Sequence, residues 1–204
     1  MFYKAIVFLP LIGAIAAGLF SLRKLDGAAV TVSIAGVCLS FILSCFAFGT
    51  IALGGEQATI DVARWIGSGS FQAHWTLRFD TLTAVMLIVV TGVSSCVHIY
   101  SVGYMHNDKS IARFMAYLSL FTFAMLMLVT ADNLVQLFFG WEGVGVASYL
   151  LIGFWHHKET AHTAAMKAFV VNRVGDFGFV LGILAIFALT GSVSFDAIFE
   201  SVSS

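Results

Sequence analysis

Residues 111–154 read IARFMAYLSLFTFAMLMLVTADNLVQLFFGWEGVGVASYLLIGF, an apolar run with the polar pair Asp132-Asn133 near its middle. An α-helix rises about 1.5 Å per residue, so roughly 20 apolar residues cross the ~30 Å hydrocarbon layer of a bilayer. The run is therefore too long for one crossing. Because aspartate and asparagine favour turns, the sequence predicts two adjacent transmembrane helices, over 111–131 and 133–154.

Outside this run, further apolar stretches are long enough to cross a bilayer. They cover 2–21, 28–53, 80–104 and 163–190, which gives about six predicted spans. Of the 204 residues, 60% are apolar and 10% are charged, and the mean hydropathy is +0.98. These values are typical of an integral membrane protein. The net charge of −1, without any Lys/Arg-rich run, excludes nucleic acid as a partner.

Positive charges favour alternate loops between the predicted spans. Cations follow the first, third and fifth spans, namely Arg23, Lys24, Lys109, Arg113 and Lys158. Lysine and arginine are enriched in cytoplasmic loops, so we expect this set of loops in the cytoplasm. The N-terminus and the segment 54–79, which holds Arg64 and Arg78 as its cations, are then expected outside.

The segment 54–79 has a period of two rather than a helical period. Apolar residues at 71, 73, 75, 77 and 79 alternate with polar ones, after a Gly67-Ser-Gly-Ser70 turn and the run Thr59-Ile-Asp-Val62. This alternation predicts a β-hairpin. Its strand edges would be exposed, so we expect a neighbouring subunit or loop to cover them.

The end of the chain has a helical apolar pattern. Phe195, Ile198, Phe199 and Val202 recur at helical spacing behind Ser194, a candidate N-cap, and predict a short amphipathic surface helix. The predicted fold class is therefore all-α integral membrane, with about six transmembrane helices, an outer β-hairpin and a C-terminal amphipathic surface helix.

Three ionisable residues fall at membrane depth. Glu142 lies nine residues into its span, roughly 14 Å from one end of the helix. Arg173 and Asp176 share one face of the sixth span and can pair. Charges at this depth usually face a bundle interior or a water-filled path. For the Arg173–Asp176 pair, orienting the helix and taking part in transport are equally good interpretations; for Glu142, which is flanked by glycines and has no opposite charge in its span, transport is favoured.

Two further side chains are weaker candidates. Lys167 lies about one turn into the predicted sixth span, where it either reaches the cytoplasmic interface or tunes the pKa of a carboxylate. His98 lies near the inner end of the third span. A histidine bonded to the backbone at the interface is the simpler interpretation there, and a proton relay is the alternative.

No metal or cofactor site is predicted in this chain. A dinucleotide-binding loop would require a strand directly before its glycines, and no strand precedes the glycines of 140–145. The cysteines and the loop histidines match neither a disulfide nor a zinc pattern; they are Cys38, Cys45, Cys96, His156, His157 and His162.

Several stretches together carry a resemblance to a known family. They are Phe79-Asp-Thr-Leu82, His98-Ile-Tyr-Ser-Val-Gly-Tyr-Met105, Phe139-Gly-Trp-Glu-Gly-Val-Gly145, Ser148-Tyr-Leu-Leu-Ile-Gly153 and Asn172-Arg-Val-Gly-Asp-Phe177. With these motifs the chain resembles, over nearly its whole length, the antiporter-like, proton-pumping subunit L of respiratory complex I (NADH:quinone oxidoreductase). The combination is far more specific than any one motif.

The resemblance implies a fold and a set of roles. In that family two inverted repeats of five helices each carry a half-channel, and a glutamate on a repeat's second helix pairs with a lysine on a later, broken helix. Glu142 matches that glutamate, and Arg173 and Asp176 match a pair on the next helix. Family members are several-fold longer, so the resemblance implies a fragment: 1–110 as N-terminal helices with the outer hairpin, and 111–204 as the truncated start of the first antiporter-like repeat, without the partner lysine.

The function that this resemblance implies is that of a membrane subunit of a proton-translocating NADH:quinone oxidoreductase, contributing to a proton half-channel. No redox chemistry is expected in the chain itself, and NAD, FMN, iron–sulfur clusters and quinone are expected in partner subunits. Its expected partners are other membrane subunits of complex I, the lipid bilayer and protons, in the bacterial inner membrane or the mitochondrial inner membrane. Two alternatives stay open: the large subunit of a multisubunit cation/proton antiporter, and a non-pumping structural or assembly module.

Overall fold

The computed structural model of the protein describes residues 2–69 and 71–203. Its long helices are α1 (Phe2–Leu22), α2 (Asp26–Phe48), α3 (Thr81–Tyr104), α4 (Ile111–Val129), α5 (Leu134–Ile152) and α6 (Glu159–Thr190). All of them are long and apolar enough to cross a membrane, so the predicted spans are confirmed. α2 continues through a π-helical turn, η1 (Gly49–Leu53). α6 begins four residues before the predicted span, because its first turn is polar and an apolar run does not include it.

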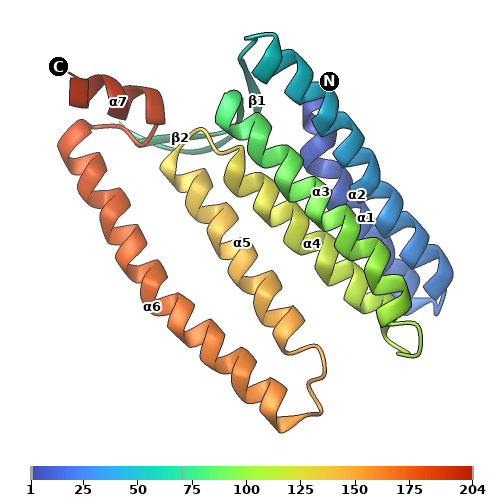
Figure 1. Ribbon diagram of the computed structural model, residues 1–204. Helices are drawn as coiled ribbons and strands as arrows, with labels where there is room; N and C mark the ends of the chain where they lie inside the picture. Colours follow the sequence, from blue (N-terminus) through green and yellow to red (C-terminus); the bar gives the residue numbers. More distant parts are fainter. Residues whose placement is uncertain (1, 70, 204) are drawn as a thin grey trace.

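The helices run antiparallel and lie side by side (Figure 1). α1 to α4 form a compact bundle, α5 packs against α4, and α6 lies beyond α5. The three short loops after α1, α3 and α5 lie at one end of the molecule, whereas the chain termini and the hairpin lie at the other. The cations that follow the first, third and fifth spans therefore share one end, as predicted, and the assignment of that end to the cytoplasm stays a prediction.

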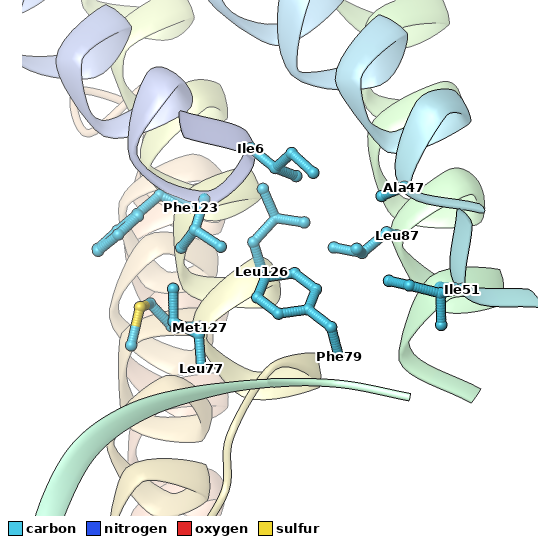
Figure 2. Packing of buried hydrophobic residues seen from close by; sticks show 11 residues of the cluster. Ile6, Ala47, Ile51, Leu77, Phe79, Leu87, Phe123, Leu126 and Met127 are labelled. Carbon is cyan, nitrogen blue, oxygen red and sulfur yellow. The ribbon is translucent and has the colours of Figure 1, made fainter. Parts of the chain in front are cut away.

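The core of the bundle lies near the end that carries the hairpin. Its buried side chains come from α1, α2, η1, β2, α3 and α4, and Figure 2 shows them meeting around Phe79 and Leu126. Helices in lipid associate through close packing rather than through burial from water. Gly36 of α2 illustrates this, because a Cβ there would lie 3.1 Å from the carbonyl oxygen of Leu9 in α1.

The predicted hairpin is present as β1 (Ala58–Ser68) and β2 (Phe71–Phe79), which pair antiparallel with two irregularities on the β1 side. Ser70 of the predicted turn lies outside the described residues. The connection between α4 and α5, with the first turn of α5, covers the outer edge of β2 by three hydrogen bonds: Arg78 N to Thr130 O (2.9 Å), Thr76 N to Gln136 Oε1 (3.0 Å) and Asn133 Nδ2 to His74 O (2.8 Å). The prediction that a loop covers the hairpin is therefore confirmed for this edge.

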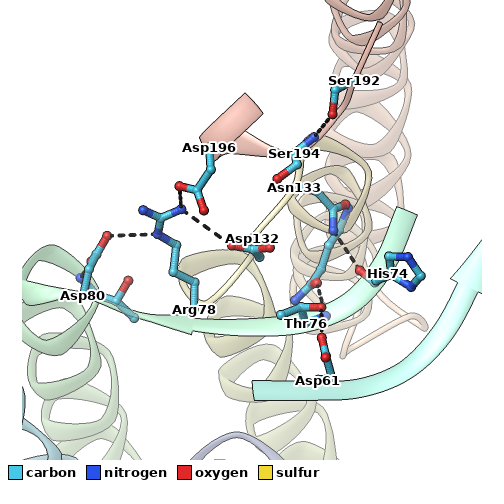
Figure 3. A network of polar contacts seen from close by, with 12 residues as sticks. Asp61, His74, Thr76, Arg78, Asp80, Asp132, Asn133, Ser192, Ser194 and Asp196 are labelled. Atoms are coloured by element: carbon cyan, nitrogen blue, oxygen red, sulfur yellow. Dashed lines mark hydrogen bonds and ion pairs between the residues drawn. The ribbon is translucent and has the colours of Figure 1, made fainter. Parts of the chain in front are cut away.

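The predicted surface helix is present as α7 (Phe195–Ser203), and it is tied to the hairpin by ion pairs around Arg78 (Figure 3). The guanidinium lies 2.6 Å from Asp196 of α7 and 3.6 Å from Asp132. It also lies 3.5 Å from Asp80, whose carboxylate caps α3 by accepting from the Thr83 N–H. One arginine thus joins β2, α3, the α4–α5 connection and α7 at the same end of the molecule.

Candidate functional site

The backbone of α5 approaches that of α4 very closely beside Glu142. A Cβ at Gly140 would lie 2.6 Å from the Cα of Leu128, and one at Gly143 would lie 3.0 Å from the Cβ of Ala124. Glycine at both positions is what permits this approach. The glycines around Glu142 therefore serve helix packing on one side of α5, while the carboxylate faces α6 on another.

Glu142 finds its cation on the neighbouring helix. Arg173 Nη1 of α6 lies 2.5 Å from Glu142 Oε1 and 3.6 Å from Asp176 Oδ2. The predicted pairing of Arg173 with Asp176 is thus present, and Arg173 also bridges to Glu142. Sequence reasoning did not supply this second contact, because spacing along one helix cannot show which residue of another helix lies opposite.

Asp176 has a further partner that sequence analysis missed. Its side chain is 7% exposed, and its Oδ1 accepts a hydrogen bond of 2.9 Å from the indole Nε1 of Trp141. Trp141 stands directly before Glu142 on α5, so two neighbouring residues of α5 contact Asp176 and Arg173 of α6. The Trp-Glu dipeptide in the sequence could have drawn attention to this tryptophan.

These side chains line a cavity of about 330 Å³ between α4, α5 and α6. Its walls are Phe121, Trp141, Glu142, Val144, Gly145, Ser148, Phe169, Asn172, Arg173 and Asp176. The cavity holds two carboxylates and one guanidinium, and hydroxyl and amide groups complete its polar surface. Such a space is large enough for several water molecules, so water can reach the charged side chains in it.

The other two predicted site residues lie elsewhere. Lys167 is exposed, lies outside the cavity, and within the described part of the chain makes no hydrogen bond or ion pair. His98 is completely buried within the helix bundle, where its Nε2 lies 3.0 Å from Ser119 Oγ of α4, and whether it is an interface histidine or a relay stays a prediction. The expected backbone bond is present, since Nδ1 lies 2.8 Å from the Ser94 carbonyl oxygen.

Two family models match the chain. Residues 65–115 match the model described as "NADH-Ubiquinone oxidoreductase (complex I), chain 5 N-terminus", and residues 131–204 match "NADH:quinone oxidoreductase/Mrp antiporter, TM". The second match contains the whole of the Glu142 site on α5 and α6.

Curated relatives match almost the entire chain. The NADH-ubiquinone oxidoreductase chain 5 of Arabidopsis thaliana is 54% identical over 98% of this chain and 30% of the relative. The NADH-quinone oxidoreductase subunit L of Rhodobacter capsulatus is 55% identical over 96% of this chain and 28% of the relative. The chain thus spans under a third of the length of these relatives.

Solved structures share the fold at low sequence identity. A chain of the archaeal membrane-bound sulfane sulfur reductase superposes with a TM-score of 0.80 at 18% identity, over 96% of this chain and 39% of that chain. A chain of the Mrp complex from Dietzia sp. DQ12-45-1b superposes with a TM-score of 0.78 at 22% identity, over 97% and 20%.

The six apolar helices within residues 2–69 and 71–203, together with the family model over 131–204, define an antiporter-like integral membrane protein. Within that class the sequence matches are specific. The chain belongs to the family of NADH-quinone oxidoreductase subunit L, also called chain 5, and corresponds to its N-terminal portion.

Proposed function

We propose that this chain forms part of a proton half-channel in a membrane subunit of NADH:quinone oxidoreductase. Glu142 is the proton-binding carboxylate, and Arg173 and Asp176 are its charged partners. The observation that carries the proposal is one guanidinium shared by two carboxylates in a cavity at membrane depth.

The charge balance of the cavity favours proton uptake. With both carboxylates ionised, the three groups carry a net charge of −1, which is costly where water is scarce. One proton on either carboxylate brings the net charge of the three side chains to zero. The site is therefore suited to take up a single proton, and the Trp141 indole donates a hydrogen bond to the second carboxylate, Asp176.

The geometry also indicates what the bound proton changes. Arg173 lies closer to Glu142 than to Asp176, at 2.5 Å against 3.6 Å. When Glu142 is protonated it loses its charge, and Asp176 becomes the stronger partner of Arg173. A charge change in the rest of the protein can thus move the arginine and release or recruit the proton. Lys167 lies outside this cavity, and both interpretations of it, a side chain that reaches the interface and a charge that tunes a carboxylate, stay predictions.

Redox chemistry is assigned to partner subunits in this proposal. The chain would supply transmembrane helices of one membrane subunit, and NAD, FMN, iron–sulfur clusters and quinone would bind to other subunits of the complex. Its membrane surface would pack against other membrane subunits, as the relatives are named for subunits of one multisubunit enzyme.

The test is a pair of substitutions in the full-length protein within its complex. Glu142→Gln removes the titratable group but also removes the cost of burying its charge, so the complex should assemble and oxidise NADH while proton pumping in vesicles falls. Glu142→Asp, which keeps the charge one methylene shorter, should retain part of the pumping. Glu159→Gln is the matched control, because Glu159 is exposed at the start of α6, away from the cavity.

Two results would contradict the proposal. If the Gln variant pumps at the wild-type ratio of protons to electrons, Glu142 does not lie on the proton path and the chain acts as a structural module. If that variant fails to assemble, the carboxylate is needed for folding and the structural interpretation replaces the proposed one.

A cation/proton antiporter remains the second candidate because the family model over 131–204 also covers Mrp antiporters. The same cavity could exchange sodium for protons. Proton movement that depends on sodium in reconstituted vesicles would favour this candidate, whereas movement that follows NADH oxidation without sodium would favour the oxidoreductase.

A further inference from the structure

A second polar cluster crosses the bundle of α2, α3 and α4, apart from the Glu142 cavity. His98 of α3 is completely buried, and its Nε2 lies 3.0 Å from Ser119 Oγ of α4. Ser119 Oγ lies 2.6 Å from Ser33 Oγ of α2, and Ser33 Oγ lies 3.2 Å from the carbonyl oxygen of Met115. Three side chains from three helices thus form a hydrogen-bonded row from the imidazole to a backbone carbonyl.

The row is fully bonded when His98 is neutral. A carbonyl oxygen can only accept, so the imidazole Nδ1 must carry the proton that is donated to Ser94 O, 2.8 Å away. The bare Nε2 then accepts from the hydroxyl of Ser119. Ser119 Oγ in turn accepts from the hydroxyl of Ser33, and every proton has an acceptor.

The row is equally well bonded when His98 carries a second proton. Nε2–H then donates to Ser119 Oγ, the Ser119 hydroxyl donates to Ser33 Oγ, and the Ser33 hydroxyl donates to the Met115 carbonyl oxygen. Each hydroxyl has simply reversed its direction. The Met115 carbonyl makes this reversal feasible, because it accepts the last proton of the reversed row.

We propose that His98 is a second proton-binding site of this membrane subunit, served by Ser119 and Ser33 as a proton relay. The step is balanced: a hydronium ion gives a proton to Ser33 Oγ and leaves as water, the former Ser33 proton moves to Ser119 Oγ, and the former Ser119 proton moves to Nε2. Three bonds to hydrogen form, three O–H bonds break, and the positive charge passes from the hydronium ion to the imidazole. This inference rests on the proposed function, because it assumes that the subunit translocates protons.

Three other buried serines of the bundle bond only within their own helix, and buried Ser40, which donates to the Ile6 carbonyl oxygen of α1, contacts no titratable group. Ser44, Ser95 and Ser101 each donate to the carbonyl oxygen four residues earlier on their own helix. This is the usual way for a serine to satisfy its hydroxyl inside a membrane helix. Ser33 and Ser119 instead bond to each other across two helices and connect to a titratable group.

The surroundings of His98 indicate that it passes the proton on. Within residues 2–69 and 71–203, no carboxylate, lysine or arginine forms an ion pair with the imidazole. The groups that face it are the hydroxyl of Ser119 on α4 and the hydroxyl and carbonyl of Ser94 on α3. An unpaired charge buried in this way is costly, so the protonated state is short-lived.

The test compares substitutions at Ser119 with a control serine in the full-length protein within its complex. Ser119→Ala breaks the row, whereas Ser119→Thr keeps a hydroxyl. Ser95→Ala removes a buried serine of α3 that bonds only within its own helix. A positioned proton-transfer group is worth about 100-fold or more in rate, so Ser119→Ala should lower protons moved per electron at least about twofold, while the Thr and Ser95 variants stay near wild type.

The outcomes separate this inference from the proposed function. Wild-type pumping in Ser119→Ala, beside reduced pumping in Glu142→Gln, overturns the relay and leaves the proposed function standing. Equal losses in Ser119→Ala, Ser119→Thr and Ser95→Ala overturn it as well, because they indicate packing. If Ser119→Ala does not assemble, Ser33→Ala breaks the same row and is judged by the same pumping ratio. A loss in Ser119→Ala that threonine restores supports the relay, even where Glu142→Gln pumps normally.

Discussion

A graded series of glycine substitutions tests whether the close approach of α4 and α5 holds the Glu142 site in place. Gly140→Ala would put a Cβ 2.6 Å from the backbone of Leu128, and ordinary contacts begin at 3.4 Å. The helices must therefore separate by 3.4 − 2.6 = 0.8 Å at this point. Overpacking of this kind costs about 1–3 kcal/mol, and the obstacle here is backbone, which cannot rotate away.

The same structure ranks the other members of the series. Gly143→Ala meets only the Cβ of Ala124 at 3.0 Å, so a small adjustment accommodates it. Gly182→Ala on α6 meets nothing within 4 Å and should leave stability unchanged or improve it, by up to about 1 kcal/mol. The order of destabilisation should therefore be Gly140→Ala, then Gly143→Ala, then Gly182→Ala.

Thermal inactivation of the assembled complex, followed together with proton pumping, measures both effects. Gly140→Ala should lower the inactivation temperature and also reduce pumping, because Glu142 lies two residues away and moves relative to Arg173. A Gly140→Ala complex that is as stable as the Gly182→Ala complex, and pumps normally, would show that α4 and α5 do not pack as described.

Two other predictions follow from the hydrogen bonds and the pKa shifts. Trp141→Phe removes a hydrogen bond to the buried carboxylate of Asp176, worth about 1.5–3 kcal/mol, so pumping should fall. Trp155→Phe loses the same kind of bond to Asp108, a half-buried aspartate in the α3–α4 loop away from the cavity, and should pump normally. Burial raises the pKa of Asp132 above its ordinary value, although Arg78 opposes the shift. The folded protein therefore binds this proton more readily, and the stability linked to it is lost as pH rises through the raised pKa. Asp132→Asn should flatten the fall in thermal stability between acidic and neutral pH; an unchanged pH profile would contradict this cause.

The fold was largely predictable because its signals are local. Apolar run length gave the six spans, and the pair Asp132-Asn133 gave the turn between α4 and α5, where Asn133 caps α5 by accepting from the Gln136 N–H. Alternation gave the hairpin. These features depend on neighbouring residues in the sequence and on the thickness of a bilayer.

The site was predictable only in part because its contacts join different helices. Glu142 and Asp176 were identified as costly charges, but nothing in the sequence shows that Arg173 reaches Glu142 or that Trp141 donates to Asp176. For His98 the bond to its own backbone was expected, but nothing in the sequence shows that its Nε2 reaches the hydroxyl of Ser119 on α4. These contacts depend on which face of each helix is turned toward its neighbour, and the hydropathy of a span does not give that orientation.

The bonds between β2 and the start of α5 have a mechanical consequence. Asn133 and Gln136 fasten the first turn of α5 to the hairpin, at His74 and Thr76, so a tilt of α5 relative to α6 would turn about this end of the helix. Glu142 lies nine residues from Asn133, on a lever arm of roughly 14 Å, and a tilt of about 5° about that end displaces the carboxylate by about 1 Å. That displacement is comparable to the difference between the two distances that separate Arg173 from its carboxylates, so a small rocking of α5 is enough to change which of them the arginine holds.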